Sequence, residues 1–427
     1  MGSPARWPAR GRLPHGAGSL GRRAAGFALY TAITVLTPLV TVPAVTSRFG
    51  ADGWAAIATA QSLGAAGAVA IDLGFGLIGT QRVARMSDAS RRRFLAVSLR
   101  IRLVAAVVVV PLSAGVAMLV VRDHVPESGC VAAAAALFGL SSTWFFVGTA
   151  APARAVVTDA IPRLAFACGA AIALSLGAPL AAYAVLVLVA AGVPPVLAVV
   201  TTGVRWDAWT YVPWHRVLRL VPKLLGPTSG RLASAAYITL PVAIVALVAP
   251  QAVAVFSVVE RLQRFTLAGM QLVPNALQGW VAVEVSRRAR LLRARRAAAA
   301  CFAIGILAAT VYAIVFDLAV SVLFSGIVDV SSSLVALSCG VIVLTCASRG
   351  VGGIWLVALG DVASVSRSAF AGAVVGLPSL VVLAWRFGAA GGLVGELVAE
   401  AAVLARQLPA AVRRHALLSA KLSGTGA

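Results

Sequence analysis

Long apolar segments alternate with short polar ones along most of the chain. Most of the apolar segments run for about 20 residues, the length that a helix needs to cross the hydrocarbon core of a bilayer. We therefore predict an all-α polytopic membrane protein, because a helix satisfies its own backbone hydrogen bonds in lipid. The twelve expected spans are Ala24–Thr46, Trp54–Leu73, Leu103–Val121, Cys130–Thr149, Ile161–Leu176, Leu180–Thr201, Leu232–Ala249, Val253–Val281, Ala297–Leu323, Ser332–Ala358, Ser368–Ala384 and Ala389–Leu408.

The span Val253–Val281 differs from the others because one face of it is polar. Its polar residues stand four, seven, four and three positions apart, so they fall along one side of a helix, with Arg261 at the edge of the stripe. A charged group that faces lipid costs about 2.5–3.5 kcal/mol on insertion scales, so the stripe must face protein or a watery cavity. We predict that it lines a central substrate cavity. The stripe consists of Glu260, Arg264, Gln271, Asn275 and Gln278.

The longest internal loop, Thr202–Arg231, divides the spans into two sets of six around this cavity. The loop holds Trp206, Trp209 and Trp214 among basic residues, which is typical of a segment lying at the membrane surface. The expected parts are a disordered basic cytoplasmic arm at 1–23, a first six-helix bundle at 24–203, an amphipathic cytoplasmic linker at 204–231, a second six-helix bundle at 232–410 and a cytoplasmic tail at 411–427.

The two halves share a weak internal repeat. When the sequence is shifted by 199 residues, Trp54–Arg91 overlays Val253–Arg290 and Gln61 falls on Glu260. Parallel repeats of this kind occur in transporters that hold their substrate between the halves. We therefore expect Gln61 at the cavity as well.

Composition and charge support a membrane protein with little room for a soluble domain. Hydrophobic residues make up 60% of the chain and charged residues 12%, and the mean hydropathy is +0.95; a soluble protein has about 25% charged residues. The net charge is +22, and 30 of the 36 Lys and Arg fall in one set of alternate loops and tails, against 3 in the other set. The positive-inside rule then places both termini in the cytoplasm. The basic excess indicates topology and contact with anionic lipids rather than nucleic-acid binding.

The residues that support catalysis or metal binding are sparse. The five cysteines lie in apolar runs without a CxxC pair, and the four histidines lie in loops or tails. We expect no structural disulfide and no metal site from this pattern. No Walker, Rossmann or nucleophile motif occurs. The sequence therefore predicts a protein that is not an enzyme and that carries no cofactor.

Four short motifs stand at the ends of expected helices. They are Arg48–Trp54, Asp72–Arg85, Trp144–Gly148 and Phe387–Gly392. In this order they resemble motifs of the polysaccharide flippases of the MOP superfamily, the O-antigen and exopolysaccharide (Wzx-like) flippases. The third motif departs from the family's Trp-Phe-Phe-Gln-Gly-x-Glu pattern, because Val147 replaces Gln and Ala150 replaces Glu.

The resemblance implies a V-shaped pair of bundles with a cavity lined by helices one, two, seven and eight. It implies a flippase that moves an undecaprenyl-diphosphate-linked oligosaccharide from the cytoplasmic to the outer leaflet by alternating access, for cell-surface polysaccharide biosynthesis. The implied location is the inner (cytoplasmic) membrane of a bacterium. The implied partners are the polyprenyl-diphosphate-linked glycan, membrane lipids, a polysaccharide polymerase and glycosyltransferases.

Three arginines inside expected spans are candidates for binding such a diphosphate. A diphosphate that crosses a bilayer needs cations in place of water, and the fork of donors on Arg can bind two phosphate oxygens. We expect some of Arg261, Arg264 and Arg349 to do so. The alternative for Arg264 is that it only neutralises Glu260, four residues earlier.

The hydroxyls of Thr34, Thr37 and Thr41 fall on one face of the first span. They could meet sugar hydroxyls across the cavity, or they could bond back to carbonyls of their own helix.

Acidic residues near or inside spans could bind a coupling proton or sodium ion. The candidates are Asp72, Glu396 and Glu400; Asp72, like Asp317, lies near a span end where solvation suffices. Glu396 and Glu400 lie four apart, and either could instead pair with an Arg from another helix.

Three other functions remain open at this point. A cation-coupled multidrug exporter of the related branch predicts a cavity dominated by acids. A membrane glycosyltransferase or polymerase predicts a large outer loop, whereas the longest one here is Arg122–Gly129. A lipid II flippase is a further alternative, although that group usually has fourteen spans.

Overall fold

The computed structural model describes residues 17–204, 209–210, 212–219, 235–284 and 286–424, and the regular structure in these ranges is helical throughout. Eight helices of the described chain are long and apolar enough to cross a membrane. Residues 1–16 of the predicted arm and most of the predicted linker lie outside the described residues, and the expected disorder was wrong for 17–23, which form the start of a helix. The described part of the linker includes a helical turn at 214–219, where Val217 is buried while Arg216 and Arg219 are exposed.

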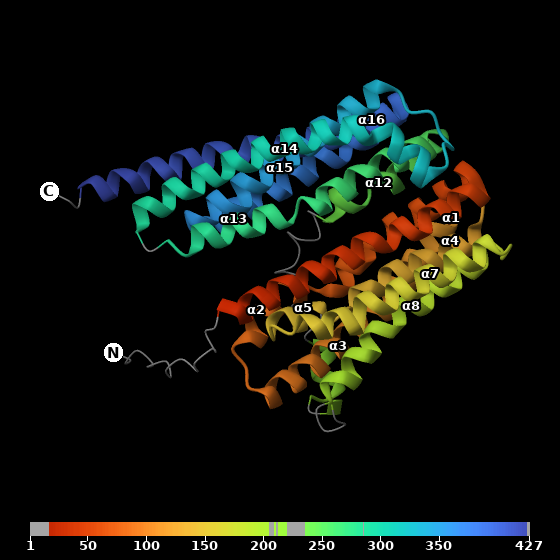
Figure 1. The fold of residues 1–427 in the computed structure, drawn as a ribbon, viewed down its shortest axis with the longest axis horizontal. Helices are drawn as coiled ribbons and strands as arrows, with labels where there is room; N and C mark the ends of the chain where they lie inside the picture. Colours follow the sequence, from red (N-terminus) through yellow and green to blue (C-terminus); the bar gives the residue numbers. More distant parts are fainter. Residues whose placement is uncertain (1–16, 205–208, 211, 220–234, 285, 425–427) are drawn as a thin grey trace.

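The helices form two bundles that follow the order of the chain (Figure 1). The first bundle contains α1 (Ala17–Asp72), α2 (Phe75–Ala84), α3 (Asp88–Val120), α4 (Val125–Leu137), η1 (Phe138–Leu140), α5 (Thr143–Gly148), α6 (Pro152–Ala155), η2 (Val156–Ala160), α7 (Ile161–Ser175) and α8 (Leu180–Thr202). The second contains α11 (Pro241–Val248), η3 (Pro250–Ala252), α12 (Val253–Gly269), α13 (Leu272–Ala282), α14 (Arg287–Phe324), α15 (Ser332–Ser348), η4 (Arg349–Leu356) and α16 (Val362–Gly424).

Two of the helices, α1 and α16, each contain two membrane spans joined at a glycine. Gly50 and Gly388 have φ angles of +62° and +58°, which glycine adopts without steric cost. In α1 the two arms on either side of Gly50 run antiparallel. This follows from two contacts, because residues of both arms touch the same end of the fourth predicted span, Cys130–Thr149. Tyr30 on the first arm bonds to Thr143 at 3.1 Å, and a Cβ on Gly139 would meet the backbone of Ala68 on the second arm. Four of the predicted spans are thus found as two hairpins.

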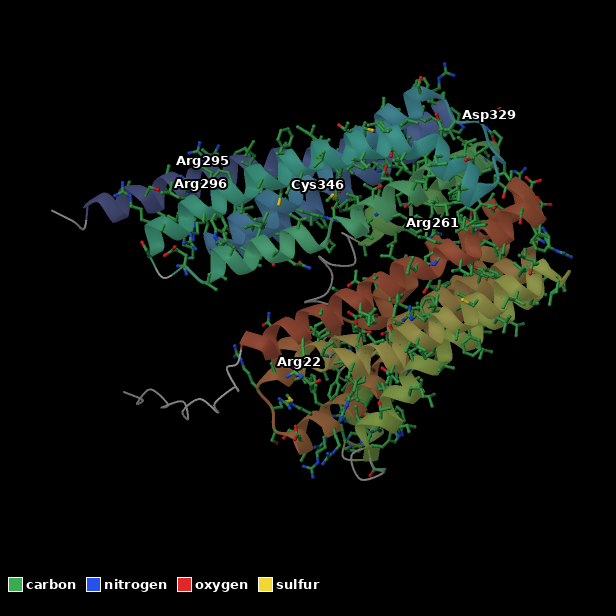
Figure 2. The ribbon with its side chains drawn as sticks, in the orientation of Figure 1. Arg22, Arg261, Arg295, Arg296, Asp329 and Cys346 are labelled. Atoms are coloured by element: carbon green, nitrogen blue, oxygen red, sulfur yellow. The ribbon has the colours of Figure 1, made fainter. Side chains whose placement is uncertain are left out.

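The two bundles form a V (Figure 1). They meet where α1 contacts α11, α12 and α14. There, Trp54 and Phe324 pack edge to face with ring centroids 5.2 Å apart, and Thr46 donates to the carbonyl of Leu323 at 3.4 Å. Figure 2 shows Arg22, Arg295 and Arg296 toward the end where the bundles diverge, and Asp329 at the opposite end. The predicted all-α architecture of about twelve spans in two bundles is confirmed.

Some predicted boundaries were wrong. The span Val253–Val281 is not one helix, because α12 ends at Gly269 and α13 begins at Leu272. The loop expected at 150–160 is largely helical, because α6 and the π-helix η2 extend the fifth span back to Pro152. Arg163 lies well inside this longer span, although the charge count grouped it with the cytoplasmic cations.

The internal repeat is present in the helices themselves. The second arm of α1 ends at Asp72 and continues as the short α2, just as α12 is followed by the short α13. Ser87 stands at the N-cap position of α3 and Ser286 at that of α14, at the same offset of 199 residues. The second arm of α1 and α12 are thus equivalent helices, and they contact each other where the bundles meet.

Candidate functional site

A cavity of about 530 Å³ lies within the first bundle and is bordered on one side by the second. Its walls come from both arms of α1 and from α4, α7 and α8, while Arg261 and Thr239 reach it from the second bundle. Aromatic and hydroxyl groups are mixed on the walls. The polar and aromatic lining consists of Thr34, Thr37, Thr41, Gln61, Phe138, Arg163, Phe166, Tyr183, Thr239 and Arg261.

The three threonines of the first arm line the cavity and also bond back to their own helix. All three line the cavity. Their hydroxyls also donate to carbonyls of their own helix, as in Thr37 to Ile33 at 2.9 Å and Thr41 to Pro38 at 3.3 Å. The hydroxyl oxygens keep acceptor capacity toward the cavity, because each hydroxyl has two lone pairs.

Arg261 joins the two bundles at the wall of this cavity. Its Nη2 donates to the amide oxygen of Gln61, and the amide nitrogen of Gln61 donates to the hydroxyl of Tyr183 at 3.2 Å. The guanidinium lies over the ring of Trp54, 5.3 Å from the centroid. The buried Nε of Arg261 has no hydrogen-bond partner among the described residues. Figure 2 shows Arg261 between the bundles, near the end where they meet.

Arg264, one turn further along α12, is surrounded by acids. It forms an ion pair with Glu260 at 2.6 Å and stands 3.8 Å from Glu396 of α16, and it also donates to the carbonyl of Ile238. Glu260, Arg261 and Arg264 line a second cavity of about 270 Å³ that shares Gln61 and Thr239 with the first. The charge of Arg264 is therefore compensated by carboxylates, whereas the acceptor of Arg261 is a neutral amide.

A third, smaller cavity of about 140 Å³ lies inside the second bundle and contains Arg349, Glu396 and Glu400. Glu396 accepts from Gln263 at 2.8 Å, and Glu400 accepts from Ser348 at 2.9 Å. Arg349 donates to the carbonyl of Leu267 at 3.1 Å. The sequence alternative in which these glutamates meet an arginine of another helix is found for Glu396.

The carboxyl-terminal part of the predicted polar stripe does not reach these cavities. Gln271, Asn275 and Gln278 are exposed and do not line these three cavities. Gln278 donates to the carbonyl of Gly353 at 2.7 Å within its own bundle. The helix that carries Asn275 and Gln278, α13, runs along the side of its bundle that faces the other one (Figure 1).

The remaining acidic candidates lie away from the cavities. Asp72 accepts two hydrogen bonds from the backbone N–H of Gly76 at 3.1 Å, which holds the start of α2. Asp317 is exposed on α14. Among the described residues, no group of three His, Cys, Asp or Glu is placed to hold a metal ion.

Sequence reasoning missed a buried charged cluster beside the first cavity. Asp159 in η2 accepts from the hydroxyl of Tyr30 at 2.6 Å and forms an ion pair with Arg163 at 2.7 Å. Thr143 and Ser141 complete the cluster. A signal was present, because Asp159 and Arg163 stand four apart as an ion pair on a helix does.

Two further cations were wrongly placed in a loop. Arg100 and Arg102 are 2% and 0% exposed within α3. Arg102 donates to the carbonyls of Gly139 and Ser141, at 3.1 and 2.8 Å, where the fourth span is interrupted. Arg102 thus holds carbonyls that the break leaves without helical partners, whereas Arg100 donates to the carbonyls of Trp209 and Val212.

No protein-family model matches the sequence, and no curated protein does. Solved structures do match, over nearly the whole chain. An inward-facing multidrug resistance MATE family transporter of the MOP superfamily matches with a TM-score of 0.55 at 15% identity, over 90% of this chain and 96% of that one. A MOP superfamily transporter from Pyrococcus furiosus, with a binding pocket of reverse polarity, matches at 0.51 and 14%, over 93% and 96%. The lipid II flippase MurJ matches at 0.53 and 9%, over 92% and 89%.

These matches are transporters rather than enzymes, and each covers about nine tenths or more of this chain. This chain is therefore a multi-pass membrane protein with the fold of the MOP superfamily transporters.

Proposed function

We propose that this protein is a flippase for a polyprenyl-diphosphate-linked oligosaccharide, which it moves from the cytoplasmic to the outer leaflet of a bacterial cytoplasmic membrane by alternating access. The cargo has three parts of different chemistry: an isoprenoid chain that stays in lipid, a diphosphate and a glycan. A protein that carries it across must supply cations and polar groups inside the membrane. Its partners are the polyprenyl-diphosphate-linked glycan and the surrounding lipids. Glycosyltransferases act before it and a polymerase acts after it.

The observation that carries the proposal is the state of Arg261. Its guanidinium faces a cavity, its acceptor is the neutral amide of Gln61, and its Nε is unpaired within the described chain. A phosphate oxygen fits this vacancy, because Arg binds phosphate through two neighbouring donors. The charge of Arg264 is more fully compensated, by Glu260 and Glu396, so we assign Arg264 a supporting role. We assign Arg349 the same role, because it lies in the third cavity and donates to the carbonyl of Leu267.

The adjoining cavity suits the glycan. Thr34, Thr37 and Thr41 offer hydroxyl oxygens, and the amide of Gln61 stands beside Arg261. Phe138 and Phe166 give apolar faces on the same walls, and a pocket that mixes apolar faces with a few polar groups is the usual form of a small-molecule site. Diphosphate and first sugar would thus lie side by side.

Orientation follows from charge. Arg22, Arg295 and Arg296 lie toward the end where the bundles diverge (Figure 2). The positive-inside rule assigns that end to the cytoplasm, together with both termini. The V then opens toward the leaflet on which the cargo is made, and the contacts among Trp54, Phe324 and Arg261 close the outer side.

A second candidate, a cation-coupled multidrug exporter, is favoured by the buried carboxylates of Glu396 and Glu400 in the second bundle. Buried acids within spans are common in proton and ion pathways. We assign them to coupling of the flippase to a proton or sodium gradient, because Arg261 gives the larger cavity a cation at its wall. The two functions differ in cargo, which an experiment can separate.

The test uses cells whose surface polysaccharide depends on this protein. Arg261→Gln is expected to reduce glycan export at least tenfold at equal protein level, with smaller losses for Arg264→Gln and Arg349→Gln. Arg386→Gln, on the exposed outer end of α16, is the matched control and should export normally. Full export by all three cavity variants overturns the diphosphate site, and resistance to cationic drugs conferred by the wild type would favour the exporter.

A further inference from the structure

We propose that Gln61 is an internal ligand of Arg261. The bond between them holds the bundles together until an anionic headgroup takes the place of Gln61 on the arginine. The inference rests on the proposed function and adds a specificity device to it: the outer side opens only when the cavity holds a negatively charged cargo. Gln61 is a positioning residue in this scheme, because it acts through the arginine.

The first step of the argument is that one contact serves two purposes. Gln61 lies on the second arm of α1 and Arg261 on α12, so their hydrogen bond crosses from one bundle to the other. Both side chains also line the cavity of about 530 Å³. A group that enters the cavity therefore meets the very bond that joins the bundles.

The second step concerns which donors are taken. Nε and Nη2 form one edge of the guanidinium, and a bidentate oxyanion uses both donors of such an edge. Gln61 occupies Nη2, while Nε of the same edge is buried and has no partner among the described residues. Nη2 carries two N–H groups, so a phosphate that binds this edge in full competes with the amide oxygen of Gln61 for Nη2.

The third step is that the exchange favours an anion. A hydrogen bond with one charged partner is roughly twice as strong as a neutral one, so the Arg261–Gln61 bond already has this gain; a phosphate adds the second charge and uses both donors of the edge. A neutral sugar or an isoprenoid alcohol offers no such gain over the amide that is already bound. A ligand shifts a conformational equilibrium only by its differential affinity for the two states, and here the difference arises at Arg261.

The fourth step is that the bond lies among the contacts that close the outer side. The neighbouring Ser62 accepts from the backbone N–H of Ala243 at 3.2 Å, and its hydroxyl donates to the carbonyl of Thr239 in the second bundle. Trp54, under the guanidinium, packs on Phe324 of α14. Gln61 follows the Gly50 turn by about 16 Å of helix, near the middle of the bilayer. We call these contacts between the two bundles on the outer side the seam. The Arg261–Gln61 bond lies at its inner edge, so loss of this bond weakens the seam.

The experiment measures opening directly rather than transport. Thr46, 1% exposed at the seam, is changed to Cys in a variant that lacks the five native cysteines. The protein is placed in nanodiscs, and the rate of labelling by a membrane-impermeant maleimide reports how often the seam opens. Undecaprenyl diphosphate is the charged probe, and undecaprenol is the uncharged one.

We expect Gln61→Ala to raise the labelling rate about fivefold without any probe, and Gln61→Glu, which gives Arg261 a charged partner, to lower it. Undecaprenyl diphosphate should raise the rate in the wild type, whereas undecaprenol should leave it unchanged. Gln81→Ala, an exposed glutamine on α2, is the matched control and should label as the wild type does.

The outcomes separate the inference from the proposed function. Equal rates in the wild type, Gln61→Ala and Gln61→Glu overturn the role of Gln61, whatever the cargo is. If the Gln61 variants change the rate but the diphosphate does not, the contact controls opening and the assignment of an anionic trigger is overturned. Gln61→Glu retains the size and polarity of the side chain, so it stays informative if the alanine variant is unstable.

Discussion

Arg264 on α12 and Glu396 on the second arm of α16 face each other across 3.8 Å, although 132 residues of chain separate them. Glu396 is 5% exposed, and its other carboxylate oxygen accepts from Gln263. Gln263 in turn accepts from Ser338 of α15, which donates also toward Tyr312 of α14. The ion pair therefore ends a polar chain that joins four helices of the second bundle.

Removal of Arg264 should leave Glu396 buried without its cation. We expect Arg264→Gln to reduce the free energy of unfolding by about 3 kcal/mol, the cost typical of breaking a buried ion pair from one side. Arg264→Gln combined with Glu396→Gln should recover the part of the loss that comes from the buried charge of Glu396, whereas Glu260 still lacks its cation. Thermal unfolding of the detergent-purified variants measures this, and a double variant as unstable as the single one would show that the two groups do not interact.

The sequence specified one partner of Arg264 and left the other as an open alternative, for a physical reason. Glu260 stands four residues earlier, and helix geometry alone brings the two side chains together. The approach of Glu396 depends on how α16 packs against α12, which hydrophobic periodicity does not specify. The same holds for Gln61: the repeat predicted that it lies at the cavity, but its bond to Arg261 depends on how the bundles meet.

The break between α12 and α13 shows a second limit of the pattern. The apolar and polar positions continue across it, so periodicity favoured one helix at Val253–Val281. Pro274 carries the explanation, since its ring excludes a helical hydrogen bond to the carbonyl of Met270 and clashes with it. Had Pro274 been given more weight than the hydrophobic periodicity, the prediction would have placed the end of α12 near Gly269.

The cluster of Tyr30, Asp159 and Arg163 should be essential for the stability of the first bundle. We expect Asp159→Asn to cost about 3 kcal/mol, because Arg163 then loses its carboxylate inside the protein. Tyr30→Phe removes one hydrogen bond to a charged acceptor and should cost about 2 kcal/mol. Chemical unfolding of the purified variants provides the measurement. If Asp159→Asn costs no more than Tyr30→Phe, the ion pair contributes little and the tyrosine is the main contact.

The hairpin of α16 closes through glycines, and a single methyl group should disturb it. A Cβ on Gly395 would stand 2.5 Å from the Cα of Leu380 on the other arm. We expect Gly395→Ala to destabilise the protein by about 2 kcal/mol, since overpacking forces backbone shifts. Gly192→Ala is the control, because nothing lies within 4 Å of that position in α8. It should be neutral or slightly stabilising, as alanine favours helix; equal effects at both sites would contradict a close-packed hairpin.

The start of α16 should lose stability in acid. Ser364 donates two hydrogen bonds to the carboxylate of Asp361, from its backbone N–H at 3.1 Å and its hydroxyl at 2.9 Å, and these lower the pKa of Asp361. A carboxylate with a depressed pKa stabilises the folded state above its unfolded pKa of about 3.9 and loses that contribution as the pH falls. Asp361→Ala should cost about 1 kcal/mol at pH 7, as loss of a helix cap does. The gap in melting temperature between wild type and variant should shrink below pH 4; a gap that is constant from pH 7 to pH 3 would assign the effect to something other than the carboxylate.

Two hydrogen bonds with the π-helix η4 hold the angle between α12 and α13. Each bond can be removed separately. Arg349 donates to the carbonyl of Leu267 near the end of α12, and Gln278 of α13 donates to the carbonyl of Gly353. A π-helix frees carbonyls from the regular ladder, which is why Gly353 can accept from a neighbouring helix. We expect Gln278→Ala to raise hydrogen exchange in 272–282 about fivefold, the effect of losing a bond worth about 1 kcal/mol, while 253–266 is unchanged. Arg349→Gln should raise exchange in the last turn of α12 instead. If both variants loosen both helices equally, α12 and α13 move as one body, and the break between them is not a hinge.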